Sequence, residues 1–212
     1  MKLNSKSFRD GGVIPGRCAF AIKAPHGHLR LSQNRNPELH WEGVPAGTRS
    51  LVLLCTDSDA PSPKPAGVNT EGTVLAADLP RGEFVHWVMV DIPPDVDCIA
   101  EGACAAGVMA RGRRGPPGPE GSRQGINDYT AWFAGDKDME GPYFGYDGPC
   151  PPWNDSIPHH YRFELLATTL ERCPVDGEFT AAAVRKALDG QVLASAALSG
   201  RYATNPALRL RP

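Results

Sequence analysis

The sequence HHYRFELLAT, residues 159–168, is the clearest indication of the fold class. Successive side chains of a strand point to opposite faces, so this stretch can be divided into two faces. One face is apolar after its first member and contains His159, Tyr161, Phe163, Leu165 and Ala167. The alternation predicts a half-buried strand whose apolar face lies on the core. His159 and Tyr161 are therefore expected at the inward end of that face, and His160 is expected to point outward.

Two other stretches are apolar on both faces, which predicts central strands covered on both sides. They are residues 51–55 of the strand candidate SLVLLC (50–55) and residues 84–90 of EFVHWVMVDI (83–92), the second interrupted by a single histidine, His86. Strict alternation would place His86 on one face with Phe84, Val88, Val90 and Ile92. A buried imidazole needs a hydrogen-bond partner, and taken alone His86 is more simply interpreted as a satisfied core histidine than as a site residue.

Shorter elements complete a strand-rich prediction, in keeping with 23 glycines and 21 prolines that punctuate short apolar runs. One helix is expected in TAAAVRKALDG, where Thr180 is a suitable N-cap and Gly190 a stop signal. A turn or strand is expected to follow in QVLASAALSGRY. The remaining strand candidates are RCAFAI (17–22), LRL (29–31) and LHW (39–41).

Residues 101–126 are rich in Gly, Pro and Arg and show no period, which predicts a long loop. Core-like segments lie on both sides of it, so we expect one domain spanning residues 1–212. Arg111, Arg113 and Arg114 could contact an anion, although charge runs in loops are more often simply solvated.

Composition narrows the function classes. The formal net charge is -2, so there is no basic field for nucleic acid or a membrane surface. No apolar run approaches the length of a membrane span, and the first residues lack the apolar core of a signal peptide. We therefore expect a cytoplasmic protein without stable membrane insertion. The six cysteines include no C-x-x-C pair, which predicts free thiols and no zinc site.

Ionisable groups stand at the ends of three apolar strands. Asp57 and Asp59 follow the first central strand and, two residues apart, would face the same way if the strand continued. Pro61 then fixes a turn, and a polar turn capping the strand is the simpler interpretation of these aspartates alone. If the segments meet, the aspartates, His86 and the His159–Tyr161 end would form a small anion pocket, since a carboxylate beside an imidazole keeps it cationic.

Several motifs in order resemble the phosphatidylethanolamine-binding protein family, also called Raf-kinase-inhibitor-like, and in particular its bacterial branch. The resemblance covers nearly the whole chain. The motifs that carry it are NPELHWEGVPAGTRSLVLLCTDSDAP (36–61), FVHWVMVDIP (84–93), GINDY (125–129), GYDGPCPP (145–152), HHYRF (159–163) and VLASAALSGRY (192–202).

The resemblance implies a mainly β fold, a β-sandwich with Greek-key order and a few peripheral helices. It also implies a cis peptide at Ala60–Pro61. Two features depart from the family pattern: Ser58 stands where proline is usual, and residues 110–124 look like a loop insertion. The pocket residues that the resemblance implies are Asp57, Asp59, Pro61, His86, Gly148, Pro149, His159 and Tyr161.

The expected function is non-enzymatic binding of a phosphate-type anion, a phosphorylated small molecule or a phospholipid head group, with no cofactor, no metal and no nucleic acid. The alternative is an interaction protein that inhibits a kinase or protease and has a vestigial pocket. A metal site or a hydrolase using Cys150 has less support, since H-E-x-x-H and G-x-S-x-G are absent. The resemblance makes a homodimer plausible. Asp57→Ala is expected to weaken anion binding with the fold largely intact.

Overall fold

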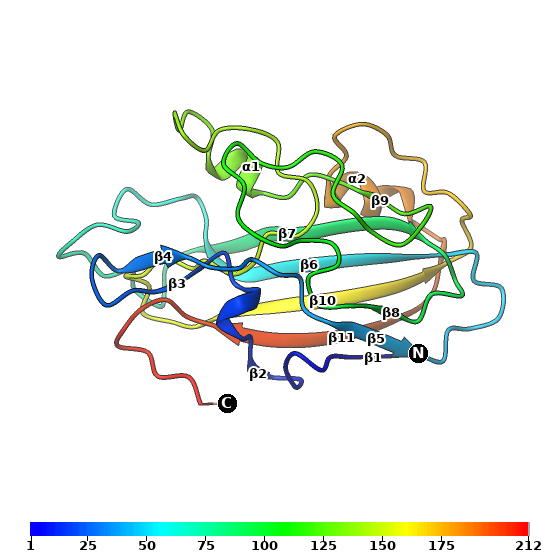
Figure 1. The fold of residues 1–212 in the computed structure, drawn as a ribbon, viewed down its shortest axis with the longest axis horizontal. Helices are drawn as coiled ribbons and strands as arrows, with labels where there is room; N and C mark the ends of the chain where they lie inside the picture. Colours follow the sequence, from blue (N-terminus) through cyan, green and yellow to red (C-terminus); the bar gives the residue numbers. More distant parts are fainter. Residues whose placement is uncertain (212) are drawn as a thin grey trace.

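A computed structural model describes residues 1–211, and its centre is a six-stranded sheet in which four long strands run side by side (Figure 1). The predicted strand at 159–168 is the central element β10 of this sheet, with the predicted bounds. β10 pairs antiparallel with both β6 and β11. In spatial order the sheet contains β2 (Gly12–Val13), β11 (Val192–Tyr202), β10 (His159–Thr168), β6 (Ser50–Pro61), β7 (Arg81–Ile92) and β9 (Arg123–Gln124).

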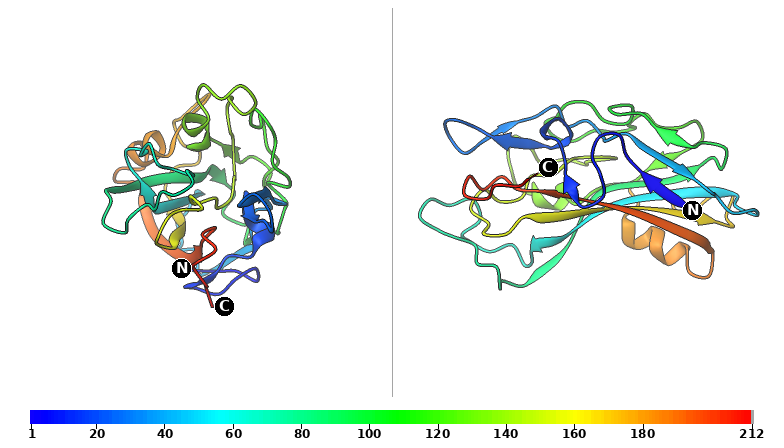
Figure 2. Two further views of the ribbon diagram at one scale, coloured as in Figure 1. Left: turned by 90° about the vertical axis from the view of Figure 1, so that its left-hand side faces the viewer. Right: turned by 90° about the horizontal axis from the view of Figure 1, so that it is seen from below.

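Smaller elements cover the long sheet. A three-stranded sheet has the order β1 (Lys2–Asn4), β5 (Leu39–Glu42) and β8 (Cys98–Ile99), and β3 (Ala21–Lys23) pairs with β4 (Leu29–Leu31). The helices are short: a 3-10 turn η1 (Gly16–Cys18), α1 (Tyr129–Trp132) and α2 (Ala181–Ala187). α2 and the N-terminal strands lie on opposite sides of the long sheet (Figure 2).

The two faces of the long sheet belong to two separate cores. The larger core packs side chains of the sheet, such as Leu53 and Phe163, against Leu39 and Trp41 of β5. The smaller core lies under α2 and includes Val88 and Val90 of β7. The central strands are therefore buried on both sides, which is why their sequences are apolar on both faces.

α2 follows the expected signals: the Thr180 side chain accepts a hydrogen bond from the Ala183 N–H. The segment that was expected to be a turn or strand is the full-length strand β11. The prediction of a mainly β fold with few helices is confirmed, whereas the β-sandwich with Greek-key order stays a prediction. None of the helices in residues 1–211 is long and apolar enough to cross a membrane.

The pairing of β6 with β7 is irregular, and this matters for the site. Cys55 pairs with Trp87, and the next residue of β6, Thr56, pairs with Val85. One step along β6 therefore corresponds to two steps along β7. His86 is thus the extra residue of a β-bulge. A second irregularity follows Asp57, where β6 gains a residue relative to β7 before Ala60 pairs with Gly82. A bulge turns the side chains after it to the other face, so strict alternation fails in both places.

Candidate functional site

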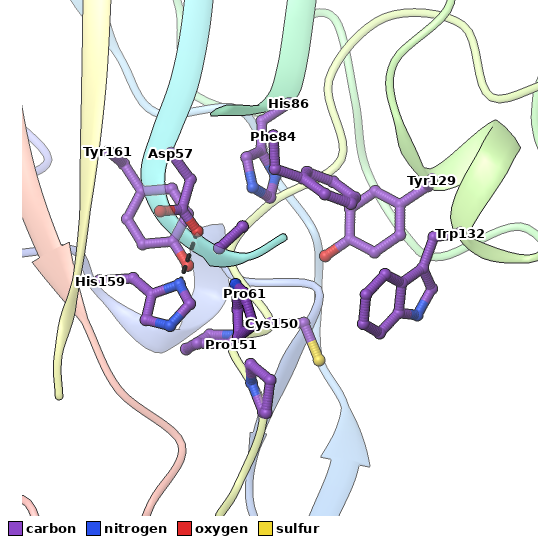
Figure 3. A pocket seen from close by; sticks show the side chains of 12 residues that line it. Asp57, Pro61, Phe84, His86, Tyr129, Trp132, Cys150, Pro151, His159 and Tyr161 are labelled. Carbon is purple, nitrogen blue, oxygen red and sulfur yellow. Dashed lines mark hydrogen bonds and ion pairs between the residues drawn. The ribbon is translucent and has the colours of Figure 1, made fainter. Parts of the chain in front are cut away.

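A small pocket lies where the neighbouring strands β6, β7 and β10 meet the loop at residues 150–152 (Figure 3). Its cavity volume is about 30 Å³, room for about two water molecules. Asp57, His159 and Tyr161 lie together on one side of it, and aromatic rings form the opposite wall. The lining residues are Asp57, Ala60, Pro61, Phe84, His86, Tyr129, Trp132, Cys150, Pro151, Pro152, His159 and Tyr161.

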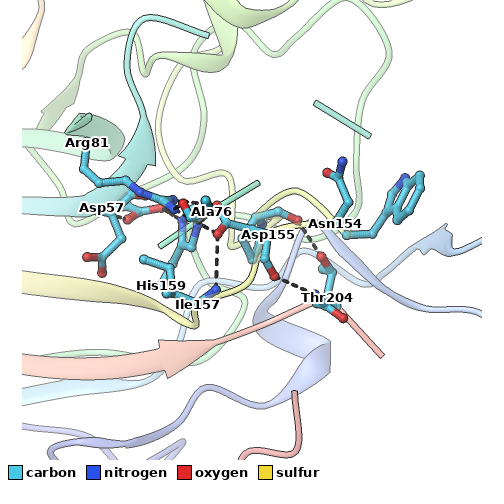
Figure 4. Close-up of polar contacts among 12 residues, drawn as sticks. Asp57, Ala76, Arg81, Asn154, Asp155, Ile157, His159 and Thr204 are labelled. Atoms are coloured by element: carbon cyan, nitrogen blue, oxygen red, sulfur yellow. Dashed lines mark hydrogen bonds and ion pairs between the residues drawn. The ribbon is translucent and has the colours of Figure 1, made fainter. Parts of the chain in front are cut away.

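Asp57 and His159 of the pocket lining belong to a chain of four charged groups that continues through Asp155 to Arg81 (Figure 4). His159 is buried and uses both ring nitrogens: Nδ1 lies 2.7 Å from Asp57 Oδ2, and Nε2 lies 3.1 Å from Asp155 Oδ2. Asp155 in turn accepts two hydrogen bonds from the Arg81 guanidinium, at 2.6 and 3.1 Å. Each carboxylate in this chain therefore has a cationic partner, which a buried charge requires.

The carboxylates determine the charge of His159. Burial by itself lowers the pKa of His159, but the hydrogen bonds with Asp155 and Asp57 outweigh it and raise that pKa to about 9. Burial raises the pKa of Asp155, yet its bonds with His159 and Arg81 leave it below the usual value. At neutral pH His159 is an imidazolium, and both of its N–H groups donate to carboxylates.

His86 is in the opposite state. Its Nδ1 lies 2.7 Å from the backbone carbonyl oxygen of Asp147, which can only accept, so Nδ1 carries the hydrogen. Burial lowers the pKa of His86, and Asp57 only partly opposes this effect. The ring is therefore neutral at pH 7, and its Nε2 is a hydrogen-bond acceptor. Its ring packs edge to face against that of Tyr161, with the two centroids 5.1 Å apart.

The Tyr161 hydroxyl is a buried polar group without a hydrogen-bond partner. Such groups are rare in folded proteins and carry a desolvation penalty of about 1–3 kcal/mol. The neighbouring phenol of Tyr129 differs, because it donates to the Gly148 carbonyl oxygen at 2.8 Å. Tyr161 is thus a donor at the pocket that the protein itself leaves unused.

The other walls are apolar. Phe84 and Tyr129 meet edge to face, and Trp132 extends this cluster to the rim, where the Lys64 ammonium lies 3.8 Å from the centre of the indole ring. Cys150 also lines the pocket, and burial raises the pKa of its thiol to about 12. A thiol in that state is protonated at neutral pH, so it lacks the thiolate that a cysteine nucleophile needs.

The structure brings five of the eight predicted residues to the pocket: Asp57, Pro61, His86, His159 and Tyr161. His86 arrives there for a different reason than alternation suggested. Val88 and Val90 face α2, whereas His86 faces Tyr161, and the bulge at His86 causes the change of face.

Asp59, Gly148 and Pro149 are not among the lining residues. The bulge after Asp57 turns Asp59 toward the outside, where it accepts hydrogen bonds from the backbone and ring of His160, both at 2.8 Å. Gly148 and Pro149 lie behind the residues that line the pocket. Their carbonyl oxygens accept from the Tyr129 hydroxyl and the Phe20 N–H, and Cys150 to Pro152 form the surface instead.

Two further expectations concern backbone and loop. The Ala60–Pro61 peptide is trans, and the cis peptide is at Ser62–Pro63. The reason is that Ala60 and Pro61 still belong to β6 and pair with Gly82 and Arg81, so the chain turns only beyond them. The 110–124 loop contributes no residue to the pocket lining.

Sequence reasoning missed Asp155 and Arg81. Asp155 precedes His159 by four residues, in a loop where its Oδ1 also accepts from the Ile157 N–H at 3.2 Å, a local Asx turn. Arg81 begins β7 and pairs in register with Pro61. Asp155 could have been suspected as a second carboxylate near a histidine, but nothing in the sequence links Arg81 to it.

Metal binding by the same groups has no geometric support, because no cluster of three or more His, Cys, Asp or Glu side chains in residues 1–211 could hold an ion. The six cysteines are all free.

The fold and this pocket can be compared with known proteins. The sequence profile of the family described as phosphatidylethanolamine-binding protein matches residues 4–203. The chain belongs to the phosphatidylethanolamine-binding protein family. Membership supports a ligand-binding or regulatory role in general terms.

Relatives in this family align along nearly the whole chain. A UPF0098 protein of Methanothermobacter thermautotrophicus is 32% identical over 95% of this chain and 98% of its own length. The UPF0098 protein YbhB of Escherichia coli is 30% identical over 95% and 99%. Among solved structures, E. coli YbcL, described as a new member of the mammalian PEBP family, superposes with a TM-score of 0.67 at 28% identity, covering 95% of this chain and 97% of that one.

Proposed function

We propose that this protein binds a small phosphate-type oxyanion, free or as part of a phosphorylated small molecule or lipid head group, without chemical conversion. The observation that carries the proposal is the buried Tyr161 hydroxyl, an unused donor beside the imidazolium of His159. An oxygen of the ligand would accept from Tyr161 and thereby remove the penalty of the unpaired hydroxyl.

The charges around the pocket are compatible with an anionic ligand of modest charge. Asp57 and Asp155 carry negative charge, and His159 and Arg81 offset it, so the buried chain is neutral overall. Because these four charges cancel, the chain does not by itself repel an arriving anion. The cavity volume, about 30 Å³, further limits the buried part of a ligand to a group of a few heavy atoms.

The residues at the mouth of the pocket would contact the part of the ligand that remains outside the cavity. Phe84, Trp132 and Pro151 present mainly apolar surface, and the Lys64 ammonium lies over the indole of Trp132. A phosphate bearing an apolar or second anionic substituent would find partners there. We propose no catalytic step, since the thiol of Cys150, with a pKa of about 12, is protonated.

A titration with phosphoethanolamine between pH 5 and 8, followed by NMR shifts and calorimetry, tests this function. We expect saturable binding, with the largest shifts at Tyr161 and His86. Tyr161→Phe should weaken binding about tenfold, the effect of about 1–2 kcal/mol for one lost hydrogen bond, and should leave the free energy of unfolding unchanged or slightly higher.

Tyr143→Phe is the matched control, because its hydroxyl donates to the Met139 carbonyl oxygen and Tyr143 is not a lining residue. This control should bind like the wild type. Absence of binding over the whole pH range, or equal affinity of Tyr161→Phe and the wild type, would overturn the proposal.

A further inference from the structure

Four polar residues form what we call the pocket floor, namely Asp57, His86, His159 and Tyr161, and few of their hydrogen-bonding groups are free. Both oxygens of Asp57 already accept, Oδ1 from the Asp59 N–H at 2.7 Å and Oδ2 from His159. His159 has both N–H groups committed to carboxylates. Of the four floor residues Asp57, His86, His159 and Tyr161, only Tyr161 offers a free donor. His86 offers an acceptor, Nε2, because the Asp147 carbonyl holds its Nδ1 hydrogen.

A fully ionised oxyanion has acceptors only. Against this floor it gains one hydrogen bond from Tyr161 and meets a lone pair at His86 and a carboxylate at Asp57. Two acceptors facing each other in a buried site repel, and the His86 lone pair remains unsatisfied because, unlike the Asp57 oxygens, it has no donor within the protein. A single hydrogen placed between the ligand and His86 removes the conflict, since it turns the contact into a donor–acceptor pair.

We propose that the oxyanion enters this pocket together with one proton, which lies between a ligand oxygen and His86 Nε2. The inference rests on the function proposed above. The bond forms either as a ligand hydroxyl donating to neutral His86 or as the imidazolium of His86 donating to the ionised ligand. Both descriptions contain the same atoms, and both take the proton from solvent when the free ligand is fully ionised.

The groups around His86 agree with such a change on binding. The charged ones are Asp57 on β6 and His159 on β10, which have opposite effects on the pKa of His86. Phe84, Tyr129 and Tyr161 contact its ring with centroids 5.0 to 5.6 Å away. Hydrogen bonding to the backbone of Asp147 and Gly148 raises the pKa of His86, as Asp57 does. Burial keeps the empty site neutral, and a bound anion adds the negative charge that favours the proton.

Calorimetry of the wild-type protein with methyl phosphate tests the proposal. A phosphate monoester has its second pKa near roughly 6, so at pH 7.5 it is mostly a dianion. Titrations in two buffers of different ionisation enthalpy give the number of protons taken up, and we expect about one. The dissociation constant should then rise about tenfold from pH 7.5 to pH 8.5. Binding with no proton uptake and no pH dependence would overturn the inference and leave the proposed function standing.

His86→Gln and its control locate the proton. The Gln side chain can donate its own amide N–H to the fully ionised ligand and does not titrate, so binding by this variant should proceed with uptake close to zero. His160→Gln on the outward face should keep the wild-type value. Continued uptake by His86→Gln would show that the proton is elsewhere and overturn the assignment. If His86→Gln fails to fold, the wild-type proton count still decides. No binding of methyl phosphate at any pH between 5 and 8 would overturn both proposals.

Discussion

The strands β6 and β10 hold two carboxylate–imidazole pairs that differ almost solely in their surroundings. Asp57 and His159 meet at 2.7 Å with side chains that are 4% and 1% exposed. Asp59 and His160 meet at 2.8 Å with side chains that are 23% and 54% exposed. The partners are of the same types, and the two pairs are separated by only one or two residues along each strand.

Burial determines how much such a carboxylate–imidazole pair contributes to stability. The exposed pair is in contact with water, which weakens the electrostatic interaction, so the pair adds little to stability. In the buried pair each charge depends on its partner, and Asp155 and Arg81 extend the requirement to a chain of four groups. The buried pair faces the pocket, and the exposed pair faces solvent.

Removing one carboxylate from each pair should produce the largest difference in stability between them. Asp57→Asn should lower the free energy of unfolding by about 3–5 kcal/mol, because it leaves buried His159 with one carboxylate instead of two. Asp59→Asn should lower it by less than about 1 kcal/mol. Urea unfolding at pH 7 measures both.

This expectation revises the one drawn from the sequence, in which loss of the Asp57 carboxylate left the fold largely intact. Equal losses in the two variants would show that burial does not distinguish the pairs.

The pH dependence of stability gives the next effect. The pKa of His159 is raised from 6.5 to about 9 in the folded state. Its stabilising contribution is therefore complete below pH 6.5 and disappears as pH rises through 9, a loss on the order of 3 kcal/mol. The deficit of His159→Gln relative to the wild type should accordingly be largest near pH 6 and shrink toward pH 9.5.

His160→Gln serves as the control for that series and should show a small deficit at every pH. Should the deficit of His159→Gln stay constant from pH 6 to 9.5, His159 would not be the titrating group.

The smallest of the three effects concerns the outer end of the buried chain. Arg81→Met removes the bidentate partner of Asp155 and should lower the free energy of unfolding by about 1–3 kcal/mol. Arg162→Met removes the guanidinium that pairs with Glu164 on the outward face of β10 and should change it by at most about 0.5 kcal/mol. Thermal unfolding compares the two, and a similar change in both would argue against a coupled chain.

Local patterns were reliable where the chain is regular. The alternation in β10 placed Tyr161 inward and His160 outward, as the structure has them. The expectation that failed at Asp59 depended on an uninterrupted strand, and the bulge that follows Asp57 is not marked by any glycine within residues 57–60. A bulge is fixed by how two strands pair, so the sequence of one strand does not reveal it.

The amino-acid sequence alone predicted the long strands β6, β7 and β10, the start of α2 and the buried face of β10, since these follow from side-chain period and capping. It did not predict the short strands β1, β2, β8 and β9, and the expected strand RCAFAI (17–22) is divided between the 3-10 turn η1 and β3. It also predicted that Asp57, His86, His159 and Tyr161 meet in one pocket, although Asp57 and His86 lie within β6 and β7 and not at strand ends as expected. The tertiary structure was needed to show that His159 donates both its N–H groups to Asp57 and Asp155. It was also needed to show that His86 is neutral and that the Tyr161 hydroxyl has no hydrogen-bond partner. The physical reason is that charge and hydrogen bonding at a buried site depend on partners from distant segments, which meet only in the folded protein.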